Sequence, residues 1–357
     1  MRRREDFVGL GATFNNQELQ QAQENIEKTQ QFRRLPTTKN LTLIAHRGMG
    51  PSSLLGPKFK ASEAIPENTL AAFKQAIILG ADGIELDIFK SQDGHLMVIH
   101  DDELWRNVYG LNRDGSSLPK GETKESYKLG NKTLAELKQL AVGPSSEKIP
   151  TLEEVFNLAK EANKLRKERG VPPLILNVEL KDATASRECL DLITKYMENN
   201  PDSGVDFNSI CFCSFNHACL KELKKEATER GIADIQIAPG IKTATLFGKD
   251  NVNPDFTVKK GASYDQKGLA ELKALVEGNN FTAYDAVLWD IEQELIDLAK
   301  VGNKQLHAST SDFRQYDVDT AFAHDLYNMS QEVPVYFKCD EAGRARELLL
   351  KIALKKD

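Results

Sequence analysis

Short apolar segments alternate with segments of helical period along most of this sequence, from residue 41 to its end. The apolar segments predict eight strands, which begin at Leu41, Ile84, Leu174, Ser209, Asp234, Ala286, Gln305 and Val335. Helical patterns separate or follow most of them, at residues 69–79, 152–167, 185–197, 218–230, 291–301 and 341–352. Repeated alternation of this kind predicts parallel strands joined by helical crossovers. In the α/β class, eight such strands favour a closed (β/α)8 TIM barrel, and an open doubly wound sheet is the alternative.

Three segments depart from this alternation. Residues 1–40 are polar, with Leu19, Ala22 and Ile26 at helical spacing, which predicts a helical extension packed on the main domain; partial disorder is the alternative. Residues 41–357 then form the barrel domain. Residues 49–65 and 241–284 are predicted to be long insertions, and barrel loops at the carboxyl ends of strands shape the substrate site.

Charge and composition exclude several classes of protein. The net charge is −6, which argues against a nucleic-acid partner. No stretch approaches the length of an apolar membrane span, and the residues after Arg2, Arg3 and Arg4 are too polar for a signal peptide. Five cysteines, an odd number in a large chain, argue for reduced thiols. We therefore expect a cytoplasmic protein, with export by a non-classical signal as the alternative. The sequence makes no prediction of the oligomeric state.

The second predicted strand continues into a hairpin. Asp93-Gly94 lies between two alternating apolar segments, which is a strong hairpin signal. With these two residues as the loop, His100 lies directly opposite Asp87 on the returning strand. Glu85 shares the face of Asp87 because residues two apart on a strand point the same way. The hairpin register thus predicts that one histidine and two carboxylates lie together.

A third carboxylate belongs to the next predicted strand, where Glu179 and Lys181 share one face. At the carboxyl end of a barrel strand, Glu179 is expected to meet Glu85 and Asp87. Three carboxylates this close cannot all stay ionised without a cation. Oxygen ligands suit one hard divalent ion, Mg²⁺ or Ca²⁺, and are less suited to zinc.

A hard ion beside two histidines and two cations fits phosphodiester cleavage. The ion offsets charge that develops on the phosphate, and Arg47 and Lys181 bind phosphate oxygens. Of His46 and His100, one removes a proton from the nucleophile and the other protonates the leaving oxygen. Histidine suits both tasks because its ordinary pKa is about 6.5. The assignment of acid and base between them stays open.

An ordered set of motifs identifies the family that the chain resembles. The motifs are His46-Arg47-Gly48, Pro66-Glu67-Asn68-Thr69, Gly80-Ala81-Asp82, Glu85-Leu86-Asp87, Asp93-Gly94, His100-Asp101, Thr133-Leu134-Ala135-Glu136-Leu137, Ile149-Pro150-Thr151-Leu152-Glu153-Glu154 and Glu179-Leu180-Lys181. Each motif alone is weak, but together and in this order they resemble the glycerophosphodiester phosphodiesterases, over residues 41–220.

The resemblance implies a metal-dependent TIM barrel that hydrolyses small glycerophosphodiesters, such as glycerophosphocholine, to an alcohol and sn-glycerol 3-phosphate. It implies that a neighbouring glycerol hydroxyl attacks phosphorus and that water then opens the cyclic phosphate. By position, it implies an acid–base pair, His46 and His100, and a set of metal ligands, Glu85, Asp87 and Glu179. It also implies phosphate-site residues, Arg47 and Lys181, and an acidic group beside the first histidine, Glu67.

The last third of the sequence departs from the family pattern. Members often carry Trp-Thr-Val-Asn on the seventh strand and Thr-Asp on the eighth, where this chain has Leu306-His307-Ala308-Ser309-Thr310 and Lys338-Cys339-Asp340. His307 is predicted either to line the site or to fill the barrel. Two further functions stay open: a lyase-like relative that cleaves lysophospholipids or sphingomyelin to a cyclic phosphate, and a catalytically inactive binding module.

Overall fold

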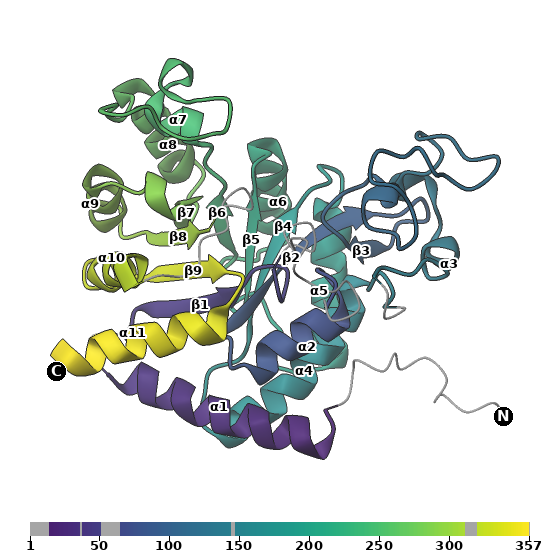
Figure 1. Ribbon diagram of the computed structural model, residues 1–357, viewed down its shortest axis with the longest axis horizontal. Helices are drawn as coiled ribbons and strands as arrows, with labels where there is room; N and C mark the ends of the chain where they lie inside the picture. The colour runs from purple at the N-terminus through teal and green to yellow at the C-terminus, as the bar shows by residue number, and fades with distance from the viewer. Residues whose placement is uncertain (1–13, 36–37, 51–64, 144–146, 311–319, 357) are drawn as a thin grey trace.

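The computed structural model describes residues 14–35, 38–50, 65–143, 147–310 and 320–356 and contains the expected parallel strands. They are β1 (Leu41–Ala45), β2 (Gly83–Lys90), β4 (Ile175–Leu180), β5 (Ile210–Ser214), β6 (Gln236–Pro239), β7 (Ala283–Val287), β8 (Gln305–Ser309) and β9 (Val335–Cys339). They are hydrogen-bonded in the order β6-β5-β4-β2-β1-β9-β8-β7, which curves round as Figure 1 shows.

Backbone contacts join the two end strands of this order, β6 and β7. The Thr282 N–H donates to the Ile237 carbonyl at 2.9 Å, and the Ile241 N–H donates to the Asp285 carbonyl at 2.7 Å. A parallel bridge between Gly240 and Asp285 lies beside the second contact. The sheet is therefore a nearly closed eight-stranded barrel. The TIM-like prediction is confirmed, and the open doubly wound sheet is wrong.

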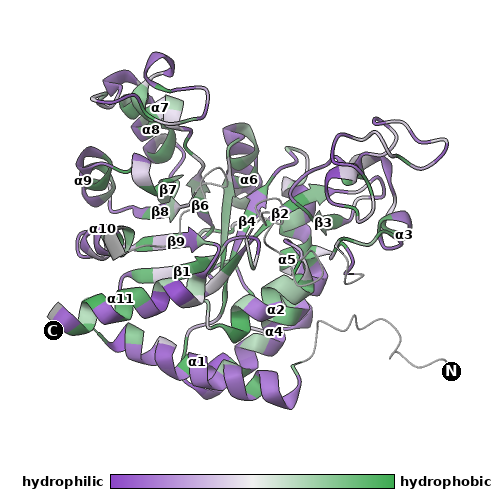
Figure 2. Ribbon diagram, in the orientation of Figure 1, coloured by the Kyte–Doolittle hydropathy of each residue, from purple (hydrophilic) through white to green (hydrophobic). Residues whose placement is uncertain are grey.

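Helices cover the outside of the barrel. The longer ones are α2 (Leu70–Ile78), α4 (Leu152–Glu168), α5 (Ser186–Asn199), α6 (His217–Glu229), α8 (Gln266–Gly278), α9 (Gln293–Val301), α10 (Thr320–Ser330) and α11 (Ala342–Lys356). Figure 2 shows hydrophobic residues in the strands and hydrophilic residues on many outer helix faces. None of the helices in the described ranges has the length and hydrophobicity required to span a bilayer.

Strand β2 shows how the pleat separates core from site. Ile84, Leu86 and Ile88 are fully buried in the apolar layer between the strands and the helices. Glu85 and Asp87 alternate with them and therefore point into the barrel. The same alternation that builds the outer core thus places two carboxylates inside.

The N-terminal extension is the helix α1 (Asn16–Arg34). It begins at a capping box, in which the Asn15 side chain accepts from the Glu18 N–H and the Glu18 carboxylate accepts from the Asn15 N–H. Ala22, Ile26 and Phe32 are buried, and Phe32 belongs to the main core. The predicted helical extension is confirmed for these residues, and Figure 1 shows it lying along the barrel beside α11.

Two segments differ from their predicted forms. Strand β7 begins at Ala283, three residues before its predicted start, because it contains Asp285, a charge that no apolar pattern includes. The predicted insertion at 241–284 holds the short helix α7 (Thr243–Phe247) and the crossover helix α8. Most of the other predicted insertion, residues 51–64, lies outside the described residues.

The hairpin after β2 forms with a different register. Strand β3 (Leu96–Val98) pairs antiparallel with β2, with Ile88 opposite Val98 and Lys90 opposite Leu96. These pairs are displaced by one residue from the predicted register, so the prediction that His100 faces Asp87 across the ladder is wrong.

The turn itself explains the shift. The Ser91 N–H donates to the His95 carbonyl at 2.9 Å, which leaves three residues in the loop instead of two. Gly94 ends that loop at φ +85°, the left-handed conformation typical of three-residue hairpins. Asp87 consequently lies opposite Ile99, whose N–H donates to the Asp87 carbonyl at 3.0 Å, and His100 lies beyond the end of β3.

Candidate active site

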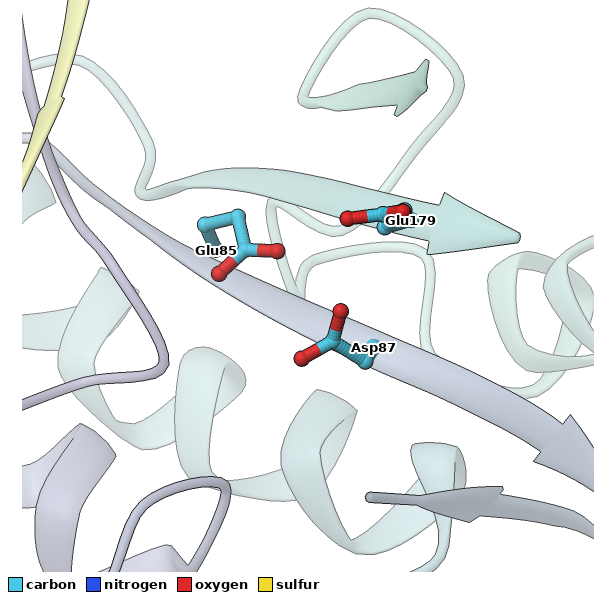
Figure 3. A group of neighbouring side chains, drawn as sticks. All are labelled: Glu85, Asp87 and Glu179. Carbon is cyan, nitrogen blue, oxygen red and sulfur yellow. The ribbon is translucent and has the colours of Figure 1, made fainter. Parts of the chain in front are cut away.

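Three carboxylates converge inside the barrel, as predicted. Glu85 and Asp87 lie on β2, and Glu179 lies opposite Asp87 on β4. Each offers an oxygen within 4.8 Å of the others, and Figure 3 shows the three side chains turned toward one another. Glu85 and Asp87 are 2% and 1% exposed. Such a group of acids requires compensating positive charge.

Asp87 receives much of that charge. Lys181 Nζ lies 3.2 Å from its Oδ1, and Arg47 Nε lies 3.6 Å from its Oδ2. The Asn68 side chain donates to Oδ2 at 2.8 Å and accepts from the Asp87 N–H. Although burial opposes ionisation, the Lys181 and Arg47 charges hold the pKa of Asp87 well below its usual range. Asp87 is therefore a fixed anion.

Glu85, unlike Asp87, is held in a setting that disfavours its ionised form. The Arg47 N–H donates to its Oε2 at 2.9 Å. Burial and the adjacent Asp87 charge raise the pKa of Glu85 to about 7. A proton on Glu85 relieves the repulsion at neutral pH, and a divalent cation would relieve it more completely. The three-oxygen donor set fits a hard cation such as Mg²⁺ or Ca²⁺.

Arg47 and Asn68 reach the carboxylates from backbone conformations that such residues rarely adopt. Their φ values are +47° and +55°, and the Asn68 N–H donates to the Arg47 carbonyl at 3.1 Å. The Arg47 guanidinium also pairs with Glu67 at 3.1 Å. Non-glycine residues in this region concentrate at functional sites. Glu67, Arg47 and Lys181 thus all belong to the predicted cluster.

Each of the two predicted acid–base histidines has a carboxylate partner. His46 Nδ1 lies 2.9 Å from Asp340 Oδ1, and His100 Nδ1 lies 3.0 Å from Asp101 Oδ1. These contacts leave Nε2 as the second nitrogen of each ring, and in His46 it lies 4.0 Å from Glu85 Oε2. A carboxylate at Nδ1 fixes the ring and favours the tautomer with its lone pair on Nε2.

The interior below the carboxylates is also polar. Lys338 Nζ lies 2.5 Å from Asp285 Oδ2, and both residues are buried. His307 is fully buried and stacks on Tyr336 with ring centroids 4.8 Å apart, so it fills the barrel and does not line the site. Burial holds the pKa of His307 well below its usual value.

The residues that position the others were not predicted from the sequence. Asn68 holds Asp87, and Asp340 and Asp101 hold the histidines. Asn68 and Asp101 stand in quoted motifs next to assigned residues, so adjacency was an available signal. The Asp340 contact joins residues 294 positions apart, and no local pattern indicates such a contact.

Comparison with known proteins places the chain in a family. The sequence model of the glycerophosphoryl diester phosphodiesterase family matches residues 46–325. The chain belongs to this family. A glycerophosphodiester phosphodiesterase of Caldanaerobacter subterraneus is 35% identical over 220 residues, which are 59% of this chain and 69% of that protein. A glycerophosphodiester phosphodiesterase of Bacillus altitudinis is 34% identical over 143 residues, which are 40% of this chain and 45% of that protein.

Solved structures share the fold of this member of the glycerophosphoryl diester phosphodiesterase family. A glycerophosphodiester phosphodiesterase of Agrobacterium tumefaciens matches with a TM-score of 0.55 and 16% identity, over 86% of this chain and 99% of that one. A phosphodiesterase of Oleispira antarctica, solved with the product sn-glycerol-3-phosphate, matches with a TM-score of 0.54 and 20% identity, over 86% of this chain and 96% of that one. At these identities the likeness concerns the fold.

Proposed function

We propose that this protein hydrolyses glycerophosphodiesters to an alcohol and sn-glycerol 3-phosphate with the help of one divalent cation, Mg²⁺ or Ca²⁺. The carboxylate cluster carries the proposal, because His46 and Lys181 lie against it and the His100 charge helps to lower the pKa of Asp87. Family membership and the activity named for the Caldanaerobacter relative support it. So does the product bound by the Oleispira phosphodiesterase of the same fold.

We assign the cation to Glu85, Asp87 and Glu179, whose oxygens lie together. When bound, the cation supplies Lewis acidity toward a non-bridging phosphate oxygen. Lys181, at 2.7 Å from Glu179, then stands at the edge of the cluster and contributes its charge to the substrate phosphate. Arg47 offers a planar guanidinium to the same phosphate, and its ion pair with Glu67 orients it.

His46 and His100 move the protons. One accepts the proton of the glycerol hydroxyl that attacks phosphorus, and the other donates a proton to the departing alcohol oxygen. The two then exchange roles as water opens the cyclic phosphate. Asp340 and Asp101 keep each ring oriented and stabilise its imidazolium form. We also propose that residues 1–40 are an extension of the barrel domain, 41–357, and not a separate unit.

The deciding experiment follows glycerophosphocholine by phosphorus NMR with Mg²⁺, Ca²⁺ or a chelator. We expect choline and sn-glycerol 3-phosphate with at least one cation, and no turnover with chelator. His46→Ala should lower kcat by about 10²–10⁴-fold. The matched control is His95→Ala, since His95 pairs with Asp93 on the exposed hairpin turn.

Two outcomes contradict the proposal. A cyclic phosphate that accumulates and is not opened would indicate the lyase-like activity, to be tested on lysophospholipids and sphingomyelin. Equal binding of a diester by the native chain and His46→Ala, with turnover by neither, would indicate an inactive binding module.

A further inference from the structure

A second charged cluster lies on the outer side of the barrel wall. Asp82 immediately precedes β2, is fully buried, and accepts a hydrogen bond from the Leu43 N–H at 3.0 Å. It points away from the carboxylates of the site, because Asp82 and Asp87 fall on opposite faces of the strand. The two residues are five positions apart, roughly 16 Å along an extended strand. The cluster around Asp82 is thus separate from the proposed active site.

Three arginines from three helices surround this one carboxylate. Arg33 of α1 lies 3.3 Å from Asp82 Oδ1, through Nη2. Arg346 of α11 approaches Oδ2 at 3.5 Å, and Arg166 of α4 approaches Oδ1 at 4.0 Å, both through Nη2. Their mutual proximity is electrostatically costly, and it adds to burial in lowering the pKa of Arg166 to about 10. With three positive charges and one negative charge, these four side chains carry a net charge of about +2.

Several guanidinium N–H groups in this cluster have no acceptor or only a distant one. Within the described residues, Nε of Arg346 has no hydrogen-bond partner, and Nη2 of Arg166 and of Arg346 reach only the Asp82 carboxylate, at 4.0 and 3.5 Å. The other nitrogens of Arg166 are satisfied, since Nε donates to the Pro172 carbonyl and Nη1 to the Ala81 carbonyl. A buried charged donor without a close acceptor is unfavourable. A further anion would offset the net positive charge of the cluster and accept hydrogen bonds from these N–H groups.

We propose that Arg33, Arg166 and Arg346 bind a small inorganic anion of the halide class between the barrel wall and helices α1, α4 and α11. The side chains of Arg166 and Arg346 are only 3% and 4% exposed, which favours a single-atom anion over a phosphate monoester. Arg33 is 25% exposed and gives the anion a path from solvent. The anion offsets the excess charge and accepts from the unsatisfied N–H groups. It thereby joins both terminal helices to the barrel.

Thermal unfolding in chloride-free buffer tests this site. Sodium chloride replaces sodium gluconate at constant ionic strength, so that screening stays fixed and only the small anion changes. We expect Tm to rise with chloride and to follow a binding curve, by about 2 °C for each tenfold increase above the dissociation constant. Bromide soaked into crystals should give an anomalous peak next to Arg166 Nη2 and Arg346 Nε.

Matched variants locate the effect. Arg346→Met removes the unpaired Nε and the weakly paired Nη2 and should abolish the chloride response. Arg169→Met is the control. Arg169 comes directly after the end of α4, the helix that contains Arg166, and pairs with Glu27 of α1 on the exposed surface. This variant should keep the full response. If Arg346→Met does not fold, Arg33→Met replaces it and should raise the chloride concentration needed for half of the response.

Two results would overturn the proposal. One is an equal Tm in chloride and gluconate together with no bromide peak at the cluster, which would make the arginines a structural brace. The other is a chloride response that persists in Arg346→Met with bromide bound at Lys181, which would assign the anion to the active site.

Discussion

Replacing Glu85 by Gln should stabilise the protein when no divalent cation is bound. The pKa of this carboxyl is raised from 4.5 to about 7, first by burial and then by the Asp87 charge. A carboxyl with a raised pKa in the folded state contributes stability below pH 4.5, and this contribution is lost as the pH rises toward 7. Relative to a side chain that is always neutral, Glu85 therefore destabilises the cation-free protein by about 3 kcal/mol at pH 8, where it is ionised in both states. At pH 6 the cost is about 2 kcal/mol, because the folded protein keeps Glu85 protonated while the unfolded chain ionises it.

Urea unfolding in chelator at pH 6 and pH 8 measures these values. The native protein should lose about 1 kcal/mol from Glu85 between the two pH values, whereas Glu85→Gln keeps a neutral side chain and should not show this loss. Glu125→Gln is the control, since Glu125 is 77% exposed. Adding Mg²⁺ or Ca²⁺ at 100 times its dissociation constant should stabilise the native protein by about 2.7 kcal/mol.

Two results would contradict this prediction: Glu85→Gln is less stable than the native protein in chelator at pH 8, or both proteins lose stability equally between pH 6 and pH 8. Either result would mean that the proton on Glu85 is not what relieves the repulsion among the three carboxylates. A cation response of equal size in Glu85→Gln would show that Glu85 is not a ligand.

Three further changes test the groups that position the site. Asp340→Asn weakens a charge-assisted hydrogen bond to His46 and should lower kcat about 10- to 100-fold with little change in KM, as steady-state kinetics would measure. Asn68→Ala removes the amide that holds Asp87 and should weaken cation affinity about 10- to 100-fold in a calorimetric titration. Gly48→Ala puts a Cβ 2.7 Å from the backbone of α2 at φ +83°, so urea unfolding should report a loss of about 1–3 kcal/mol.

Much of the fold follows from the sequence because a barrel strand needs one apolar face and one inward face. Ile84, Leu86 and Ile88 show the apolar face, and the carboxylates between them show where the interior lies. Pattern analysis fails where a strand breaks this rule. Asp285 lies within β7, and its charge is compensated by Lys338, which approaches to 2.5 Å from β9, two strands away in the sheet.

The position of a site residue can be predicted when the register of its own strand fixes it. It cannot be predicted when a side chain from a strand remote in the sequence fixes it. Glu179 meets Asp87 because β2 and β4 pair in register at these residues. Asp340 meets His46 because β9 lies beside β1, which depends on how the barrel closes. Asp340 and His46 do not change the apolar pattern of their own segments. The closed fold therefore has to be known before the contact between them can be inferred.

His100 shows that a wrong register need not give a wrong site. In a continuous strand, a shift of one residue would turn His100 to the opposite face of the sheet. Strand β3 ends at Val98, however, so the ladder no longer fixes the side chain two residues later. Asp101 holds the imidazole at 3.0 Å and is itself held by Arg106 at 3.3 Å. The His100 charge still lowers the pKa of Asp87, so this histidine lies close enough to the carboxylates to act on them although the hairpin register differs from the predicted one.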